Sequence, residues 1–197
     1  MFIDYLTLML VNMSAALALL GFFLLLGVQG ADARAWSAPF LITGLIAFVT
    51  GLHMILTWPL PGPYNTLFGE TTVLLGAILL GIALSVGMGR SLPPLAVFIV
   101  VASLVAILLG CRIINLSLTA SPAMSGLGFI LAGIGGLLTA GAFLCASSRS
   151  LKIVGASVLF VTAALWLFVG LSAYWAHAKS LGNWQPTTMR QQPPANK

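Results

Sequence analysis

The stretch PLAVFIVVASLVAILLGCRII, residues 94–114, decides the fold of this chain. Arg112 is its only charged residue, and most of the other side chains are aliphatic. An apolar run of about 20 residues is long enough to cross the hydrocarbon core of a bilayer as an α-helix. A helix is predicted because lipid offers no partner to an unpaired backbone group, and the alternating pattern of a membrane β-barrel is absent.

Similar apolar runs fill nearly the whole chain. The predicted spans are residues 5–28, 38–57, 67–87, 94–114, 124–146 and 151–175. Of the 197 residues, 60% are hydrophobic and 6% are charged, which excludes an ordinary soluble domain. We therefore predict an all-α, polytopic integral membrane protein. It has one six-helix transmembrane domain over residues 1–178 and a polar, proline-containing tail over residues 179–197.

Basic residues between the spans predict the orientation. Arg34, Arg90, Arg149 and Lys152 follow the first, third and fifth spans, whereas the connections after the second and fourth spans carry no basic residue. The positive-inside rule then places these four residues on the cytoplasmic side and both termini outside. We interpret the net charge of +5 as this topology signal rather than as a nucleic-acid surface.

The stretch GLHMILTWPLPGPYNTLFGET, residues 51–71, concentrates the scarce polar chemistry of the chain between the second and third spans. His53 and Glu70 lie about one turn inside the predicted outer ends of their spans, and Arg112 lies near the outer end of the fourth. Ionisable groups at this depth are costly unless paired or hydrated, so we predict that Glu70 and Arg112 are partners. Uncharged residues complete the predicted outer-face site: Trp58, Tyr64, Asn65, Asn12 and Asn115.

These residues fit a channel or transporter for a small neutral solute. Glu70 and Arg112 would hold the polar site at the outer face, and His53 would tune it with pH. Structural roles are the alternative, with Glu70 and Arg112 as a clamp and Trp58 and Tyr64 as interfacial aromatics. The sequence shows no motif of a hydrolase, a metalloprotease or a phosphate-binding enzyme, so we predict no catalytic residues and no enzyme activity.

A cofactor-binding membrane protein is the second functional class. His53 and His177 are the only histidines, and both fall on the predicted outer side, so haem between the second and sixth spans is one alternative. Copper is the other, with His53 beside the methionines Met9, Met13 and Met54; Met9 and Met13 share a helix face. The preferred interpretation requires no metal and no cofactor.

An accessory subunit of a larger membrane complex is a third possibility. Small residues recur every four positions in the third and fifth spans, and such faces let helices pack closely within the chain or between subunits. We accordingly expect a homo-oligomer or a subunit of a membrane complex, with the lipid bilayer as the other partner and no nucleic acid.

Segments of the chain resemble two known families. The segments MFIDYLTLMLVNMSAALALL, GLHMILTWPLPGPYNTLFGE and RIINL together resemble a prokaryotic membrane protein family known as domain of unknown function 981, which implies a six- or seven-helix membrane protein. We predict that the protein lies in the prokaryotic plasma (inner) membrane. The segment LFGETTVLLGAILLG, residues 67–81, with the six spans and external termini, is similar to the urea and short-chain amide channel family. That likeness implies an oligomeric ring with one pore per protomer. Glu70 stands where that family has an aromatic residue.

Overall fold

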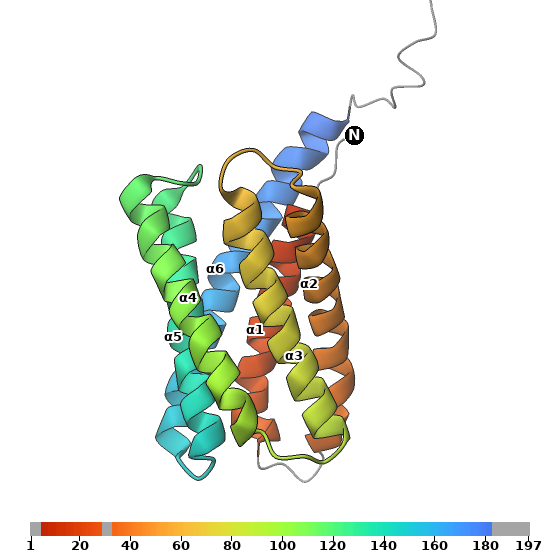
Figure 1. The fold of residues 1–197 in the computed structure, drawn as a ribbon, viewed down its shortest axis with the longest axis vertical. Helices are drawn as coiled ribbons and strands as arrows, with labels where there is room; N and C mark the ends of the chain where they lie inside the picture. Colours follow the sequence, from red (N-terminus) through yellow and green to blue (C-terminus); the bar gives the residue numbers. More distant parts are fainter. Residues whose placement is uncertain (1–4, 29–32, 183–197) are drawn as a thin grey trace, which may run out of the picture.

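The computed structural model describes residues 5–28 and 33–182, without the side chains at 180 and 181, so most of the predicted tail lies outside the described residues. Within this part, six helices are long and apolar enough to cross a membrane, and they alternate in direction (Figure 1). They are α1 (Leu6–Phe22), α2 (Ser37–Thr57), α3 (Thr71–Gly87), α4 (Ala96–Leu116), α5 (Pro122–Leu144) and α6 (Arg149–Leu181). The predicted all-α membrane fold is confirmed.

Short segments of other helix types extend several spans. A π-helical turn, η1 (Phe23–Gly27), continues α1, and another, η3 (Asn65–Glu70), precedes α3. The 3₁₀ turns η2 (Ala33–Trp36) and η4 (Pro93–Leu95) precede α2 and α4. The last helix continues past residue 175, where the predicted span ends. The residues beyond 175 are more polar and do not suit lipid, but they can stay helical where the helix emerges into water.

The helices pack as three antiparallel pairs: α1 with α6, α2 with α3, and α4 with α5. The pair α1–α6 lies behind the two hairpins in the view of Figure 1, and α5 also packs on α6. In contrast, α3 and α4 make few contacts although they follow one another in the chain. We call the end with connections 58–64 and 117–121 the Trp58 end. The opposite end carries Arg34, Arg90 and Arg149.

Glycines seven residues apart hold the α2–α3 hairpin together. Gly51 on α2 lies against the backbone oxygen of Gly69, and Gly44 lies against the backbone nitrogen of Leu80. Gly76 on α3 lies in turn against the backbone of Phe48, so the two backbones come close at these positions. A Cβ atom added at Gly76 would lie 2.5 Å from the backbone nitrogen of Phe48. Small residues of this kind permit close helix contact in lipid, where helix association depends on packing.

Helix α5 presents one glycine face to each of two neighbours. Gly126 and Gly133 face α4, where Gly110 lies opposite Gly126. Gly128 and Gly135 face α6, and an added Cβ at Gly128 would lie 2.6 Å from the indole ring of Trp166. The seven-residue spacing, rather than the four-residue spacing noted in the sequence, therefore describes these two seams.

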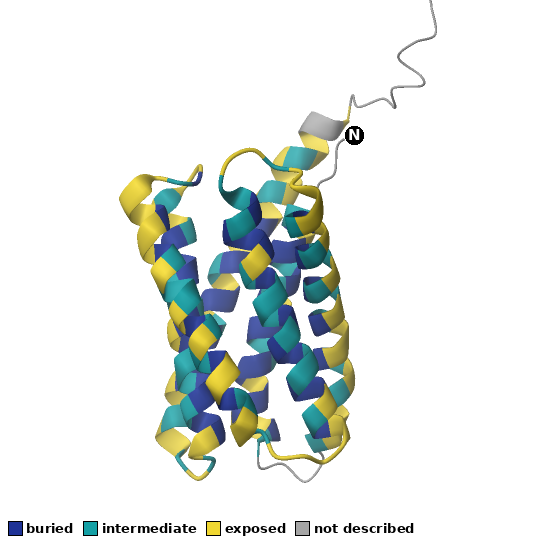
Figure 2. Cartoon of the chain, in the orientation of Figure 1, coloured by how far each residue is buried: buried dark blue, intermediate teal, exposed yellow. Residues whose placement is uncertain are grey.

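Buried residues fill the centre of the bundle, and exposed residues cover its outside (Figure 2). The exposed set includes many large apolar side chains, such as Leu26, Leu56, Val97 and Phe168. On a soluble protein so many exposed apolar residues would mark an interface or an aggregation risk. On six apolar helices they are the expected lipid-facing surface.

Candidate functional site

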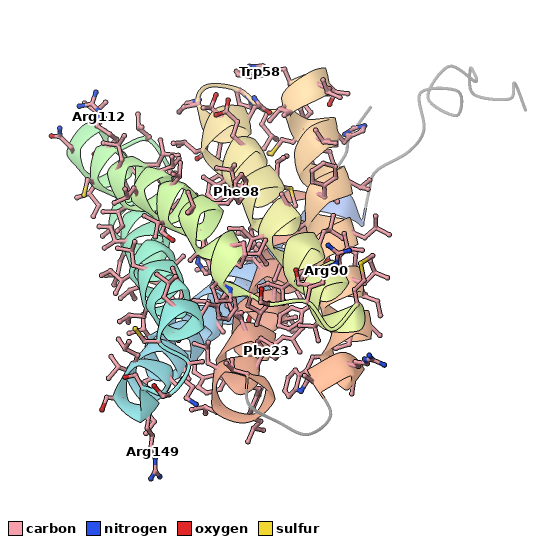
Figure 3. All side chains as sticks on the ribbon, turned by 60° about the horizontal axis from the view of Figure 1, so that its bottom comes forward. Phe23, Trp58, Arg90, Phe98, Arg112 and Arg149 are labelled. Atoms are coloured by element: carbon pink, nitrogen blue, oxygen red, sulfur yellow. The ribbon has the colours of Figure 1, made fainter. Side chains whose placement is uncertain are left out.

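The predicted outer-face residues do not form one site. Glu70 and Arg112 are both exposed. Both belong to the described part of the chain, and no ion pair joins them there. Figure 3 shows Arg112 at the tip of α4, directed away from the bundle. Gly110 faces α5, and two further residues turn a helix by about 200°, so Arg112 points outward.

Asn65 has a structural role in the turn between α2 and α3. Its side chain is fully buried, with the amide group donating to the backbone oxygen of Leu60 at 2.5 Å. The side-chain oxygen accepts from the backbone nitrogen of Leu60 at 3.1 Å. Trp58, which begins this turn, has a φ of 46° and lies at the surface (Figure 3). Asn65, which the sequence predicted as part of the outer-face site, thus stabilises the turn.

The other predicted asparagines also lie apart. Asn12 is buried in α1 and donates from its side chain to the backbone oxygen of Thr43 at 2.9 Å, which ties α1 to α2. Asn115 is exposed near the end of α4. Tyr64 reaches across the Trp58 end, since its phenol oxygen accepts a hydrogen bond from the backbone nitrogen of Ala120 at 3.1 Å.

The two histidines lie on different helices, His53 on α2 and His177 on α6. The ring of His53 is exposed and meets the ring of Tyr5 edge-on at 5.2 Å between centroids. Nδ1 of His177 lies 3.3 Å from the hydroxyl oxygen of Thr7. His53 on α2 and His177 on α6 thus contact different residues near the start of α1.

The methionines of the copper alternative lie deeper in the bundle. Met9 and Met54 are buried in the core, and Met13 lines an internal cavity. In residues 5–28 and 33–182, no group of three or more His, Cys, Asp and Glu side chains is arranged to hold a metal ion. Haem and copper stay predictions.

A cavity of about 90 Å³ inside the bundle is the main feature that the sequence did not reveal. Its lining comes from α1, α3, α4, α5 and α6 and is almost entirely aliphatic and aromatic. On α5 the lining positions run from Phe129 to Thr139, which corresponds to about 15 Å along a helix. The cavity is therefore elongated along the bundle.

The polar groups of the cavity wall are few. Thr71, Ser103 and Thr139 each donate their hydroxyl hydrogen to the backbone oxygen four residues earlier, at 2.5, 2.7 and 2.8 Å. Trp166 differs, because its indole nitrogen is buried and has no hydrogen-bond partner within the described chain. No charged side chain of the described residues lines the cavity.

An aromatic column connects the cavity to the Trp58 end. Tyr64 stacks on Phe68 with 6.0 Å between ring centroids. Phe68 in turn meets Phe129 at 5.3 Å and Trp166 at 6.3 Å, both edge-on. Phe129 and Trp166 complete the group at 5.8 Å. Residues from η3, α5 and α6 thereby form one packed unit on the side of the cavity nearer the Trp58 end.

Comparison with protein families gives a match over residues 1–180, to the family described as "Protein of unknown function (DUF981)". The chain belongs to this family. The match covers all six helices almost to the end of α6, so the family fold is the whole bundle. No curated protein and no solved structure matches the chain. The resemblance to urea and amide channels accordingly finds no support.

For this DUF981 protein, one sequence signal could have indicated the cavity. Small residues cluster at 102, 103 and 106 on α4 and at 132, 133 and 136 on α5, and all of them line it. Two such runs on consecutive spans leave space between helices wherever the opposite wall does not fill it. The polar residues were more conspicuous in the sequence, yet the structure disperses them.

Proposed function

We propose that this protein is a membrane-embedded binding protein for a small, neutral and largely apolar molecule. The observation that carries this proposal is the internal cavity of about 90 Å³ lined by five of the helices. Ligand sites are typically concave and mostly apolar, with a few polar groups that fix orientation. The cavity has this character, and it lies among the helix segments that are apolar enough to be within the bilayer.

The chemistry of the lining favours a neutral ligand. A charged ligand in hydrocarbon needs a countercharge, and no charged side chain lines the cavity in the described chain. A strongly hydrated ligand needs several free hydrogen-bonding groups, but the hydroxyl hydrogens of Thr71, Ser103 and Thr139 are already donated within their own helices. The neutral solute predicted from the sequence therefore remains, and its binding site moves into the bundle.

The arrangement of the hairpins indicates where the ligand would enter. The cavity is partly open, and α3 and α4 contact one another at few points. Near the end of the bundle opposite the Trp58 end, the side chain of Leu95 approaches Gly81 of α3. At the Trp58 end, the hydrogen bond from Ala120 to Tyr64 joins the hairpins. Between these two contacts, a gap between α3 and α4 would open the cavity to the lipid phase.

Passage across the membrane is a further step that the sequence predicted. It would require an outlet at one end of the bundle, and the Tyr64–Ala120 contact lies where an outlet at the Trp58 end would form. Self-association, the accessory-subunit role and the prokaryotic inner membrane also stay predictions.

Fluorescence of Trp166 tests occupancy of the cavity. In a variant with the other tryptophans replaced by phenylalanine (Trp36, Trp58, Trp175 and Trp184), Trp166 reports alone, and its side chain is only 1% exposed. The protein is placed in lipid nanodiscs and titrated with 1-bromoundecane, because bromine quenches indole fluorescence at contact. We expect saturable quenching.

A matched pair of variants identifies the site. Ala132→Phe places a large ring in the cavity wall, whereas Ala164→Phe adds the same ring on an exposed position of α6. Saturable quenching that Ala132→Phe abolishes and Ala164→Phe preserves supports the proposal. Quenching that rises linearly in both variants shows only contact with bulk lipid and overturns it.

A further inference from the structure

A second pocket lies at the end of the bundle opposite the Trp58 end. Its volume is about 310 Å³, and its lining comes from the ends of the first, third and fifth spans and from the starts of the second and fourth. The linings of this pocket and of the internal cavity share no described residue. Sites for small molecules have volumes of about 300–1,000 Å³, so this pocket is large enough to be a binding site of its own.

The floor of the pocket is apolar. Phe23 and Phe143 line it and are buried, and their rings meet edge-on at 6.3 Å between centroids. Val86 is also buried in this lining. Leu25 and Leu26, which follow Phe23 in the chain, are exposed, as side chains that face lipid would be. The pocket therefore lies beside the lipid-facing surface at the end of the spans, where hydrocarbon gives way to water.

Two arginines stand at this pocket. Arg90 lines it and is exposed, so its side chain is accessible from solvent, and Figure 3 shows it at the same end as Phe23. Arg34 approaches from the start of the second span. A Cβ atom added at Gly89, another lining residue, would lie 3.5 Å from Nη2 of Arg34. Gly89 has a φ of 65°, which favours glycine, so no side chain fills the place beside this guanidinium group.

The two guanidinium groups have no ion pair and no hydrogen bond within the described chain. Glu70, the carboxylate among the described residues, lies at the Trp58 end. Asp32 is the one carboxylate that the sequence places among the four basic residues of the arginine-bearing end, and it lies outside the described residues. A guanidinium group presents a planar set of donors that matches a phosphate. The rim of the pocket thus offers unused donors and positive charge to an anion.

We infer that this pocket binds the phosphate group of an anionic membrane lipid between Arg34 and Arg90. The upper part of one acyl chain then lies on the apolar floor. The site is separate from the internal cavity and does not depend on the proposed function. A free phosphate compound offers the same anion but gains nothing from the apolar floor, so a lipid fits the pocket better, and the experiment separates these two sources.

Arg149 distinguishes a binding site from a merely charged surface. It lies at the same end and is exposed, but it is not part of the pocket lining, and Figure 3 shows it directed away from the bundle. Loose attraction to anionic lipids requires only that basic residues lie near the membrane surface, so it would treat all three arginines alike. A phosphate site in the pocket depends on Arg34 and Arg90 and not on Arg149.

Native mass spectrometry of the whole protein tests the inference by counting bound lipids. Protein freed of lipid in detergent is titrated with dioleoyl phosphatidylglycerol and, separately, with dioleoyl phosphatidylcholine, whose choline group neutralises the phosphate. We expect one phosphatidylglycerol to bind before any others and more tightly than phosphatidylcholine. Arg34→Gln and Arg90→Gln should each weaken this first step about tenfold, as loss of a charge-assisted hydrogen bond does, and Arg149→Gln should change it less than about twofold.

Anions without acyl chains form the second arm. Sodium phosphate and glycerol 3-phosphate are added to the complex with phosphatidylglycerol, and we expect neither to displace the lipid at equal concentration. Displacement by glycerol 3-phosphate at the concentration at which phosphatidylglycerol itself competes would assign the pocket to a free phosphate compound and overturn the lipid as its ligand.

Two further outcomes overturn the inference. Equal weakening by Arg34→Gln, Arg90→Gln and Arg149→Gln would show loose attraction to a charged surface. Binding of phosphatidylglycerol that appears only in Asp32→Asn would show that this carboxylate already occupies the arginines of the wild-type chain. All four positions are changed to uncharged side chains of similar size, and circular dichroism should show the same helix content in each variant.

Discussion

The phenol oxygen of Tyr64 accepts a hydrogen bond from the backbone nitrogen of Ala120 at 3.1 Å, across 56 residues of sequence. It joins the connection between α2 and α3 to the connection between α4 and α5, above the cavity. Because α3 and α4 otherwise make few contacts, this bond is positioned to limit how far the two hairpins separate at the Trp58 end.

Tyr64→Phe should loosen this end while the fold persists. The variant keeps the ring that stacks on Phe68 and removes only the acceptor for Ala120. We expect a loss of stability of about 0.5–1.5 kcal/mol, the net value of one hydrogen bond. The distance between the hairpins should also become longer or more broadly distributed.

Electron–electron distance measurements check the second effect. Spin labels are placed at Leu56→Cys on α2 and Leu116→Cys on α4, both exposed, after Cys111 and Cys145 are replaced by serine. Tyr64→Phe should change this distance distribution. Identical distance distributions with Tyr64 and with Tyr64→Phe would show that the hydrogen bond does not restrain the hairpins.

Gly76→Ala should destabilise the α2–α3 hairpin. Its new Cβ would lie 2.5 Å from the backbone nitrogen of Phe48, and backbone atoms cannot move aside as a flexible side chain can. We expect a cost of about 1–3 kcal/mol, typical of overpacking, measured by unfolding in a detergent titration with circular dichroism.

Gly141→Ala is the matched control on α5. There the added Cβ would meet a side-chain carbon of Leu151 at 3.7 Å, an ordinary contact distance. Because alanine favours a helix by about 1 kcal/mol over glycine, this variant should be neutral or more stable. Equal destabilisation by both substitutions would contradict the seam.

Asn65→Ala should weaken the turn that follows α2. It removes both hydrogen bonds to Leu60 and leaves the amide nitrogen and oxygen of that residue without these partners. Partly buried groups without partners cost about 1–3 kcal/mol, so the connection 58–64 should become more open. Proteinase K should cleave the connection faster in the variant, and cleavage at the wild-type rate would exclude this role.

Glu70→Gln and Arg112→Met test whether these residues interact. Both side chains are exposed and form no ion pair within the described structure, so each change should alter stability by less than about 0.5 kcal/mol. The double variant should show the sum of the two effects. A coupling energy clearly above this range would restore the partnership predicted from the sequence.

The sequence alone determined the helices and their order across the membrane. Lipid requires each spanning segment to satisfy its own backbone, so length and apolarity identify a span without knowledge of its neighbours. Glycine seams were also visible as small residues, although their seven-residue spacing was recognised only from the packing of α2 on α3 and of α4 on α5.

The tertiary structure decided which faces of these helices meet. In a soluble helix the apolar stripe marks the core, but helices that are apolar on all sides carry no such signal. The sequence therefore could not show that Gly110 turns towards α5 and leaves Arg112 outside, nor that both ends of the Asn65 amide bind Leu60. For the same reason, only the packed bundle showed Phe68, Phe129 and Trp166 together beside a cavity, since these residues come from three separate segments whose contacts depend on close packing.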